Sequence, residues 1–518
     1  MNDQHEYDTY DEVLRHWAHH RPDAIATDFG DRQISYSELE ELTAKLVAYF
    51  KQQGLEKGDR IAWLGKNSDL YALLFAAAGR MGVVIAPIGW RLAPPEIAYI
   101  AKDAGAKLLF AGEEFVESAQ RIAATLDPSP KVVSEEACWR ILRDAERCEF
   151  GAAGVDDGIL QLYTSGTTGN PKGVVLTSGN LIHLRRHARE AQLPWSVSQP
   201  DDCLLIAMPI AHIGGTGLIS ACFVNGVRAL LQSEFNPEWV LEGIEKGATQ
   251  MFIVPAALQM VIQHPRAATT DFSNMRYLMY GAAPIPLELL REAVKTMPNT
   301  HFLQAYGMTE TTGTIALLPP DDHTLEGNQR MRSAGKAVPG AEIAILDNDG
   351  KEVARGEIGE VCVRSPSNTA GYWQLPDATA STIDGDGWLH TGDAAYMDDD
   401  GYVYIQDRIK DMIITGGENV YPAEVESAIY GHPAVAEVAV IGVPSERWGE
   451  EVKACCVAKP GMEIEAGDII AWAREKIAPF KVPKSVDVIP EMPRNPSGKI
   501  LRRELRKPYW EGQERQVS

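Results

Sequence analysis

The sequence lacks the features that would place it in a membrane or in an oxidising compartment. The longest apolar candidate for a membrane span, residues 70–88, contains Arg80 and Gly82 and predicts a helix followed by a buried strand. Only seven cysteines occur in 518 residues, without a CxxC pair, so we expect buried, reduced thiols. The first residues are polar and acidic, unlike a signal peptide. We therefore expect a cytoplasmic protein without a transmembrane segment.

Positive charge is scarce as well. The chain has 49 lysines and arginines against 72 aspartates and glutamates, which gives a formal net charge of −23 at pH 7. This balance excludes a general nucleic-acid-binding or anionic-membrane surface, because both need basic faces. The length allows about two to four domains with a sizeable core. An anionic substrate would therefore bind in a local pocket that contains individual lysines or arginines.

One stretch, residues 162–176, concentrates groups that bind phosphate. It follows a predicted strand over residues 158–163 and precedes a predicted helix that Ser178 or Asn180 would cap and that runs to His187. Its hydroxyl, glycine and lysine residues are Thr164, Ser165, Gly166, Thr167, Thr168, Gly169, Lys172 and Gly173. A glycine-rich backbone can turn its N–H groups toward an anion, so the stretch predicts a polyphosphate site.

Two other interpretations of this stretch must be weighed. A Walker A loop is excluded, since Pro171 precedes Lys172 where that motif needs glycine. A solvated turn rich in serine, threonine and glycine is the alternative that the residues alone leave open.

Strand and helix patterns alternate on both sides of this stretch. A hairpin signal comes first, and Ser37 with Glu40 predicts a capping box for the helix after it. The alternation then covers residues 61–64, 70–78, 83–87, 94–104, 108–111, 203–208, 251–254, 277–280 and 302–304. It predicts a parallel sheet covered on both faces, with ligands bound beyond the carboxyl ends of the strands. The loops after the later strands are therefore expected to form the walls of one pocket.

The pattern changes twice toward the C-terminus. Short β segments come first, and they cover residues 343–346, 359–363 and 402–405. Beyond them, a second alternation of strands and helices predicts a small separate domain. We expect an α/β protein with two domains. The N-terminal domain, residues 1–409, would hold parallel α/β sheets and a β-rich subdomain, and residues 410–518 would form an α+β domain.

Several ordered motifs resemble those of the acyl-adenylate-forming superfamily, which includes acyl-CoA synthetases, firefly luciferase and peptide-synthetase adenylation domains. Besides residues 162–176, they are Gly281-Ala-Ala-Pro284, Ala305-Tyr-Gly-Met-Thr-Glu-Thr311, Thr391-Gly-Asp393, Asp407-Arg-Ile-Lys-Asp411 and Pro493-Arg-Asn-Pro-Ser-Gly-Lys499. The resemblance extends from the first hairpin to Arg506, nearly the whole chain, and it removes the solvated-turn alternative. It implies an enzyme whose small C-terminal domain is mobile.

The resemblance implies an ATP site. Tyr306 would stack on adenine, Thr309 would hydrogen-bond a phosphate, and Glu310 would hold Mg²⁺, a hard cation that prefers oxygen ligands. Asp393 would accept hydrogen bonds from the two ribose hydroxyls, supported by Arg408. A core tyrosine and a solvated aspartate turn are the structural alternatives. The backbone segments that would approach the nucleotide are Gly281, Ala282, Ala283 and Gly307.

The resemblance also implies moving parts. Lys410 occupies the hinge position, and Lys499 would contact both the substrate carboxylate and the α-phosphate. On composition alone, a lysine near the end of a chain is usually only solvated. The Gly416–Gly417 turn would line the thiol channel in a second conformation, because glycine permits close approach. Weaker matches, which surface packing explains almost equally well, place CoA contacts at Trp448, Phe480 and Lys484.

The acyl pocket is expected to involve His212, Gly214, Gly215, the 281–283 loop and Met308. Many members of the superfamily have a bulky aromatic residue before this histidine, whereas this chain has Ala211, which favours a roomier or differently gated pocket. Residues 407–422 look most like bacterial fatty-acyl-CoA ligases. An aliphatic or other bulky hydrophobic acid is therefore the expected substrate, and aryl acids of the benzoate or cinnamate type come second.

The implied reaction joins a small carboxylic acid to CoA with ATP and Mg²⁺, and it releases AMP and pyrophosphate. One alternative is a stand-alone adenylation protein that loads a separate carrier protein. Another is a nucleotide-binding relative without activity, against which the presence of Glu310, Asp393, Arg408 and Lys499 together argues. The sequence does not fix the oligomeric state, and a homodimer is compatible with it.

Overall fold

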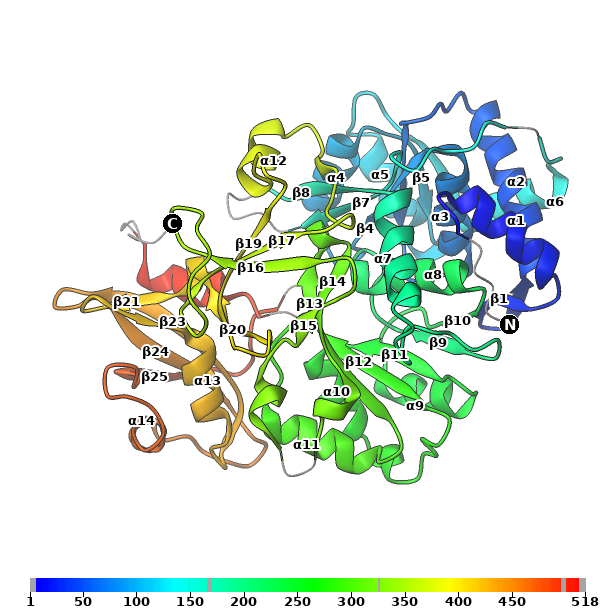
Figure 1. Ribbon diagram of the computed structural model, residues 1–518. Helices are drawn as coiled ribbons and strands as arrows, with labels where there is room; N and C mark the ends of the chain where they lie inside the picture. The colour runs from blue at the N-terminus through cyan, green and yellow to red at the C-terminus, as the bar shows by residue number, and fades with distance from the viewer. Residues whose placement is uncertain (1–5, 149, 165–169, 325–326, 495–499, 512–518) are drawn as a thin grey trace.

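The computed structural model describes residues 6–148, 150–164, 170–324, 327–494 and 500–511. It has a large N-terminal part and a smaller C-terminal part that lies against one side of it (Figure 1). None of the described helices is both long and apolar enough to cross a membrane. The predicted site residues that lie outside the described ranges are Ser165, Gly166, Thr167, Thr168, Gly169 and Lys499.

One large sheet carries the predicted phosphate-binding stretch. Its strands, in spatial order, are β18 (Gly371–Tyr372), β8 (Lys172–Thr177), β7 (Gly158–Thr164), β4 (Val84–Ile88), β3 (Arg60–Leu64), β5 (Ala106–Ala111) and β6 (Lys131–Ser134). Strands β7, β4, β3, β5 and β6 run parallel, which confirms the predicted βαβ alternation. Strand β8 returns antiparallel to β7, and Thr164 pairs with Lys172, so the described ends of the predicted phosphate-binding stretch lie on two paired strands.

A second large sheet carries the other predicted loops. Its strands, in spatial order, are β15 (Lys336–Ala337), β14 (Gly313–Leu318), β13 (His301–Met308), β12 (Tyr277–Gly281), β11 (Gln250–Ile253), β9 (Cys203–Ile206), β10 (Arg228–Leu231), β1 (Ile25–Phe29) and β2 (Arg32–Ser35). The strands from β13 to β1 are parallel, and antiparallel strands close both edges.

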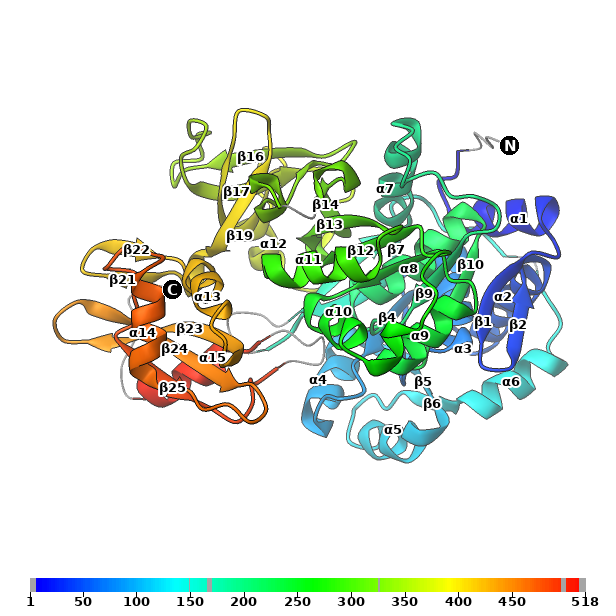
Figure 2. The same cartoon turned by 90° about the horizontal axis from the view of Figure 1, so that it is seen from below.

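Helices pack between and around the two sheets (Figures 1 and 2). Every residue of α3 is buried, as expected for a helix that contacts β7 of one sheet and β1 of the other. The N-terminal helices are α1 (Tyr10–His20), α2 (Tyr36–Gln52), α3 (Asp69–Met81), α4 (Pro94–Ala104), α5 (Val116–Ala123), α6 (Glu135–Asp144), α7 (Ser178–Glu190), α8 (Ile213–Asn225), α9 (Pro237–Glu245), α10 (Pro255–Ile262), α11 (Leu287–Thr296) and α12 (Pro376–Thr382).

Two smaller sheets follow. The β-rich subdomain is an antiparallel sheet of β16 (Glu342–Leu346), β17 (Gly359–Arg364), β19 (Leu389–Met397) and β20 (Val403–Arg408). The C-terminal domain contains β21 (Ile413–Thr415), β22 (Glu418–Val420), α13 (Pro422–Tyr430), β23 (Val435–Ser445), β24 (Gly449–Ala458), α14 (Ala466–Arg474), β25 (Ser485–Val488) and α15 (Arg502–Arg506). It has its own apolar core around Val425, Val440 and Ile469. The boundary between residues 409 and 410 remains a prediction.

The predicted helix caps differ from those observed. The capping box of α2 is formed by Ser35 and Glu38, two residues before the predicted pair. Glu40 has another role, since its Oε1 accepts a hydrogen bond from the buried Arg80 at 2.9 Å. Helix α7 is capped by Thr177, so Ser178 is its first residue rather than its cap. All seven cysteines are free thiols, as predicted.

Candidate active site

One cavity of about 2660 Å³ brings together the ends of β7, β12, β13, β19 and β20 and part of the C-terminal domain. This is the pocket that the strand-end loops predict, because the carboxyl ends of parallel strands meet at one edge of a sheet. The predicted site residues that line it are Thr164, Lys172, His212, Gly214, Ala282, Ala283, Tyr306, Gly307, Met308, Thr309, Glu310, Asp393, Arg408 and Lys410.

One end of the cavity is organised around the buried carboxylate of Glu310, in the 3₁₀ helix η3 (Thr309–Thr311). Its Oε1 accepts hydrogen bonds from the hydroxyls of Tyr372, at 2.9 Å, and Thr164, at 3.3 Å. Lys172 pairs with Thr164 across the hairpin, and its Nζ lies 4.8 Å from the centre of the Tyr372 ring. Oε2 accepts no hydrogen bond within the described part of the chain. This carboxylate in an oxygen-rich setting fits a Mg²⁺ ion.

Tyr372 is a member of this cluster that the sequence analysis missed. Burial, and then the charge of Glu310, raise the pKa of Tyr372, so its phenol remains a proton donor to that carboxylate at neutral pH. Its position depends on Trp373, whose N–H donates to the Gly173 carbonyl at 2.7 Å and so attaches this strand to β8. A Gly-Tyr-Trp run at residues 371–373, after the predicted β segment over residues 359–363, was the available signal.

Another part of the cavity is organised around Asp393, which lies opposite Arg408 in the register of β19 and β20. Asp393 Oδ2 accepts a hydrogen bond from the Tyr306 hydroxyl at 2.7 Å, and Arg408 Nε lies 3.3 Å from Oδ1. Burial, and then the charge of Asp393, raise the pKa of Tyr306, so the phenol stays protonated. The structure thus brings these three predicted residues into direct contact. Stacking of Tyr306 on adenine remains a prediction.

Two predicted glycines are required by close backbone approach. A Cβ atom at Gly307 would lie 1.6 Å from the carbonyl oxygen of Gly313, and one at Gly281 would lie 2.1 Å from that of Ala305. Side chains there would force apart the ends of β12, β13 and β14. Ala282 follows with a φ of 65°, in the left-handed region that favours glycine. The tight, strained loop lets backbone groups line the cavity wall.

The predicted acyl pocket lies at the N-terminus of α8. His212 is the N-cap residue of this helix, and burial lowers the pKa of its imidazole to about 4, so it is neutral at pH 7. A Cβ atom at Gly214 would lie 2.9 Å from the Phe252 ring, and one at Gly215 would lie 2.4 Å from the Pro209 carbonyl oxygen. Gly215 therefore allows α8 to pack closely against the Pro209 backbone and is not among the described residues that line the cavity. His212 and Gly214 do line it.

The predicted hinge lies where ion pairs join the ends of the C-terminal domain. Lys410 belongs to the 3₁₀ helix η6 (Ile409–Asp411), and burial, and then the charge of Arg408, lower the pKa of its ammonium group. Asp411 pairs with Arg506 of α15 at 2.9 Å. Lys499 lies outside the described residues, but Arg494 and Ile500, the nearest described residues on either side of it, both line the cavity.

The predicted CoA residues are not brought into this cavity. The backbone N–H of Gly416 donates to the carbonyl of Trp448 at 2.9 Å, so the turns that carry these residues are in contact at the outer edge of the C-terminal domain (Figure 1). Lys484 donates from its backbone N–H to the Val452 carbonyl, about 10 Å along β24 from that edge. Phe480 is an exposed aromatic side chain. None of the predicted residues Gly416, Gly417, Trp448, Phe480 and Lys484 is among the described residues that line the cavity.

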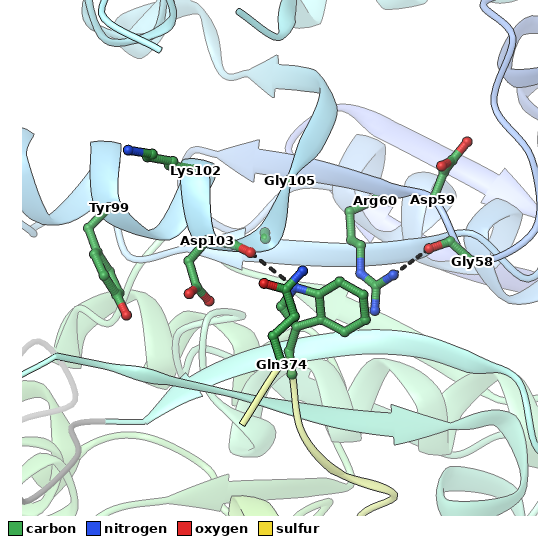
Figure 3. A pocket seen from close by; sticks show the side chains of 10 residues that line it. Gly58, Asp59, Arg60, Tyr99, Lys102, Asp103, Gly105 and Gln374 are labelled. Atoms are coloured by element: carbon green, nitrogen blue, oxygen red, sulfur yellow. Dashed lines mark hydrogen bonds between the residues drawn. The ribbon is translucent and has the colours of Figure 1, made fainter. Parts of the chain in front are cut away.

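A second cavity of about 580 Å³ lies between the start of β3, the end of α4 and the residues that follow β18 (Figure 3). The guanidinium of Arg60 lies 3.2 Å from the centre of the Trp373 ring, and the indole N–H of that tryptophan donates to the Asp103 carbonyl at 3.0 Å. No predicted site residue is among the described residues that line it. These contacts hold the strand that carries Tyr372, so they help to position Tyr372 in the larger cavity.

Comparison with known sequences is consistent with this geometry. A sequence model of the AMP-binding enzyme family matches residues 14–373, and one of the AMP-binding enzyme C-terminal domain matches residues 424–499. A fatty acid–[acyl-carrier-protein] ligase, ScoC, from Streptomyces coeruleorubidus is 39% identical over 97% of this chain and 96% of its own. A feruloyl-CoA synthase from Amycolatopsis is 37% identical over 94% of this chain and 96% of its own.

Comparison with solved structures gives the same family. The ATP-bound crystal structure of MatB from Rhodopseudomonas palustris superposes with a TM-score of 0.87 at 31% identity, covering 97% of this chain and 99% of that one. The 2-succinylbenzoate–CoA synthetase MenE from Bacillus subtilis, in complex with an acyl-adenylate, superposes with a TM-score of 0.85 at 30% identity, covering 95% of this chain and 97% of that one. These likenesses confirm the predicted fold class.

Proposed function

The chain belongs to the family of AMP-binding, adenylate-forming enzymes, and from this premise we propose that it is an AMP-forming ligase that joins a hydrophobic carboxylic acid to the thiol of CoA. One observation carries the proposal. The Glu310 cluster and the Asp393 cluster line the same cavity as His212, at the N-terminus of α8. A phosphate end, a ribose end and an acyl end are therefore available to one ATP and one acid.

In the first half-reaction, a carboxylate oxygen of the acid attacks the α-phosphorus of ATP. The bond from that phosphorus to the bridging oxygen breaks, which gives an acyl-adenylate and pyrophosphate. The Thr164–Lys172 hairpin binds the β- and γ-phosphates, and Asp393 holds the ribose. Such transfers depend on positioning and on charge stabilisation, and they need little covalent work from the protein.

Two positive charges, those of a bound Mg²⁺ ion and of Lys499, would neutralise the negative charge of the phosphates in this step. Glu310 would hold Mg²⁺, and the ion, when bound, would polarise phosphate oxygens as a Lewis acid. Lys499 would place its ammonium group between the substrate carboxylate and the α-phosphate. The described residues nearest to it, Arg494 and Ile500, line the cavity, which supports this assignment.

In the second half-reaction, the CoA sulfur forms a bond to the acyl carbon. The bond from that carbon to the phosphate oxygen breaks, its electron pair leaves with AMP, and the thiol proton passes to solvent. We propose that the C-terminal domain first turns about Lys410, withdraws Lys499 and brings the Gly416–Gly417 turn to the cavity. Trp448, Phe480 and Lys484 then contact CoA. A thiol with a pKa of about 8.5 beside a good leaving group needs no dedicated strong base.

The acid is proposed to be aliphatic or another bulky hydrophobic type, with aryl acids second. The apolar side chains that line the cavity beside His212 include Leu184, Ile213, Leu218 and Phe252. They favour a hydrophobic acyl body, since burial of apolar surface yields about 25 cal/mol per Å². The neutral imidazole of His212 adds a polar group without adding charge.

A separate carrier protein is the second candidate acceptor. ScoC, a relative of similar length along the whole chain, is named as a ligase for an acyl-carrier protein. Its acceptor would present the same kind of thiol at the same channel. Free CoA remains the first candidate because feruloyl-CoA synthase, which is similar over almost the same extent, is named for CoA.

The test is AMP release from ATP across a panel of acids, each with CoA, with a phosphopantetheinylated carrier protein, or with no acceptor. The panel runs from short to long fatty acids and adds benzoate-, cinnamate- and steroid-type acids. We expect CoA-dependent AMP release with one group of acids. Release that depends only on the carrier protein would select the second candidate, and no release with any acid would contradict a ligase function.

A further inference from the structure

A partly buried arginine lines the acyl side of the cavity. Arg185 lies on α7, which packs beside α8 (Figure 1), and its Nη2 donates to the carbonyl oxygen of Gly217 on α8 at 3.3 Å. The cavity around it is lined by Leu184, Ala188, Leu218 and Ala221. The sequence analysis did not select this residue. Its guanidinium therefore faces a mainly apolar space between two helices.

This arginine has no carboxylate partner among the residues that the structure describes. Burial lowers the pKa of the Arg185 guanidinium, and the groups that oppose this effect are the Tyr10 phenol and the Cys222 thiol. Burial also raises the pKa of both of these groups, so both are neutral at pH 7. A partly buried charge without a counter-charge in a mainly apolar space is unfavourable, and an anion in the cavity would relieve that cost.

The adjacent arginine shows what an ordinary arrangement looks like on the same helix. Arg186 Nη2 lies 2.7 Å from Asp8 Oδ1 and donates to the Tyr7 carbonyl, also at 2.7 Å. It is not among the described residues that line the cavity. Arg186 is therefore neutralised by a carboxylate of the protein, whereas Arg185, which lines the cavity, is available to an anion bound there.

The spacing along α8 separates this charge from the reacting end of the substrate. Gly217 lies five residues after His212, which corresponds to about 7.5 Å along the helix axis. The residues between them that line the cavity include Ile213 and Gly214. An extended acyl chain with its reacting carboxylate near His212 would reach the guanidinium with its distal end.

We propose that Arg185 binds a second carboxylate at the distal end of the acyl substrate, so that the preferred acid is a dicarboxylic acid with an apolar middle. This inference rests on the proposed function, because it assigns the acid of the same reaction. Arginine forms bidentate, charge-assisted hydrogen bonds with carboxylates, which gives both affinity and a fixed chain length.

The test compares suberic acid with octanoic acid and monomethyl suberate, which match its length but lack the second charge. The panel extends from succinic to sebacic acid to find the optimal length. For the wild-type protein we expect kcat/KM for AMP release to be about ten- to hundredfold higher with the best diacid than with its monoester. Equal values for the diacid and its monoester would overturn the proposal.

Variants test whether Arg185 causes this preference. Arg185→Met keeps the length of the side chain and removes its charge, so it should lose the preference and accept octanoic acid as well as the diacid. Arg185→Lys should keep part of the preference. Arg186→Met is the matched control and should leave it unchanged. A preference that survives in Arg185→Met would assign the second carboxylate to another group and overturn the proposal.

A binding measurement separates failure of this inference from failure of the proposed function. Calorimetric titration of the purified chain with the best diacid needs no turnover. Diacid binding that Arg185→Met weakens, without AMP release from any acid, would support the inference and contradict the ligase function. AMP release with monocarboxylic acids only, unchanged in Arg185→Met, would support the ligase and contradict the inference.

Discussion

The predicted nucleotide region, around Glu310 and Asp393 on the large domain, and the predicted thiol-channel region, around Gly416 and Trp448 on the C-terminal domain, differ in how far their residues are assembled. In the nucleotide region, Glu310 and Asp393 each already contact two partners in one cavity. In the predicted thiol-channel region, Gly416, in the turn between β21 and β22, and Trp448, in the turn between β23 and β24, contact each other at the outer edge of their domain, and neither is among the described residues that line that cavity.

This difference has a mechanistic meaning. Arg494 and Ile500, on either side of Lys499, line the cavity, whereas Gly416 and Trp448 do not. Under the proposed function, this arrangement suits acyl-adenylate formation, and the thiol step would require the C-terminal domain to move. If this is right, variants in the two regions should affect different half-reactions.

The largest effect is expected for Lys499→Ala. Loss of the ammonium group should lower the rate of acyl-adenylate formation by about 10²–10³-fold, because preorganised charge is a major source of stabilisation in such steps. Thioester formation from a supplied acyl-adenylate should be retained. Pyrophosphate release and thioester formation are the two readouts, and Lys507→Ala, an exposed lysine of the same domain, is the control. Equal loss of both steps would remove Lys499 from its assigned role.

Glu310→Gln should also weaken the first step, by about 10²-fold, and should raise the Mg²⁺ concentration needed for half-maximal rate. The neutral amide keeps the shape of the side chain but is a poorer ligand for a hard cation. A Mg²⁺ titration of pyrophosphate release checks this. Glu352→Gln, an exposed carboxylate of the β-rich subdomain, is the control. An unchanged Mg²⁺ dependence would show that Glu310 does not hold the ion.

Gly416→Ala should act on the other half-reaction. Gly416 has a φ of 60°, and a Cβ atom there would lie 2.8 Å from the Trp448 ring, so the turn and the indole must shift. We expect thioester formation to fall about tenfold, in line with a strain of about 1–2 kcal/mol, while adenylate formation is spared. Gly461→Ala is a matched control, because its φ is 76° and no atom lies within 4 Å of its Cβ position. Loss of adenylation in Gly416→Ala would contradict the separation of the two regions.

Tyr306→Phe should have a smaller effect, confined to the nucleotide. The variant removes the hydrogen bond to Asp393, and a bond to a charged group contributes about 1.5–3 kcal/mol. Because solvent or ribose can replace part of it, we expect KM for ATP to rise about five- to tenfold. Steady-state kinetics with saturating acid measures this. Tyr277→Phe is the control and should leave KM for ATP unchanged, because Tyr277 begins β12, at the end of that strand away from the 281–283 loop. An unchanged KM for ATP would contradict the ribose assignment.

The smallest effect concerns pH. The folded chain holds the pKa of His212 at about 4, against an ordinary value of 6.5, because the residue is buried. As pH falls from 6.5 to 4, the unfolded chain binds a proton there that the folded chain does not, so the free energy of unfolding decreases. His212→Gln should flatten this decrease in urea titrations, whereas His301→Gln, at an exposed site, should not. Parallel curves for His212→Gln and the wild type would show that His212 titrates normally.

Elements defined by local periodicity could be predicted from the sequence. The predicted helix over residues 94–104 coincides with α4, and the predicted strand over residues 61–64 is β3 without its first residue. Local patterns fail where two candidates overlap. Ser35 with Glu38 and Ser37 with Glu40 both fit a capping box, and only the fold shows that Glu40 binds Arg80.

Contacts between distant segments could not be predicted in the same way. Tyr372 reaches Glu310 because its strand pairs with β8, nearly 200 residues earlier in the chain. Arg185 and Arg186 are indistinguishable by type and position, and only the packing of α7 shows that one faces the cavity and the other faces Asp8. The predicted ATP residues could be identified from sequence motifs, whereas the proposed distal carboxylate site depends on packing.

The most direct test of the two-region account measures both half-reactions in the same preparations of Lys499→Ala and Gly416→Ala. Acyl-adenylate formation is followed by pyrophosphate release, and the thiol step by thioester formed from supplied acyl-adenylate and CoA. The account predicts opposite losses, with Lys499→Ala defective only in the first step and Gly416→Ala only in the second. Loss of both steps in the same ratio in both variants would contradict it.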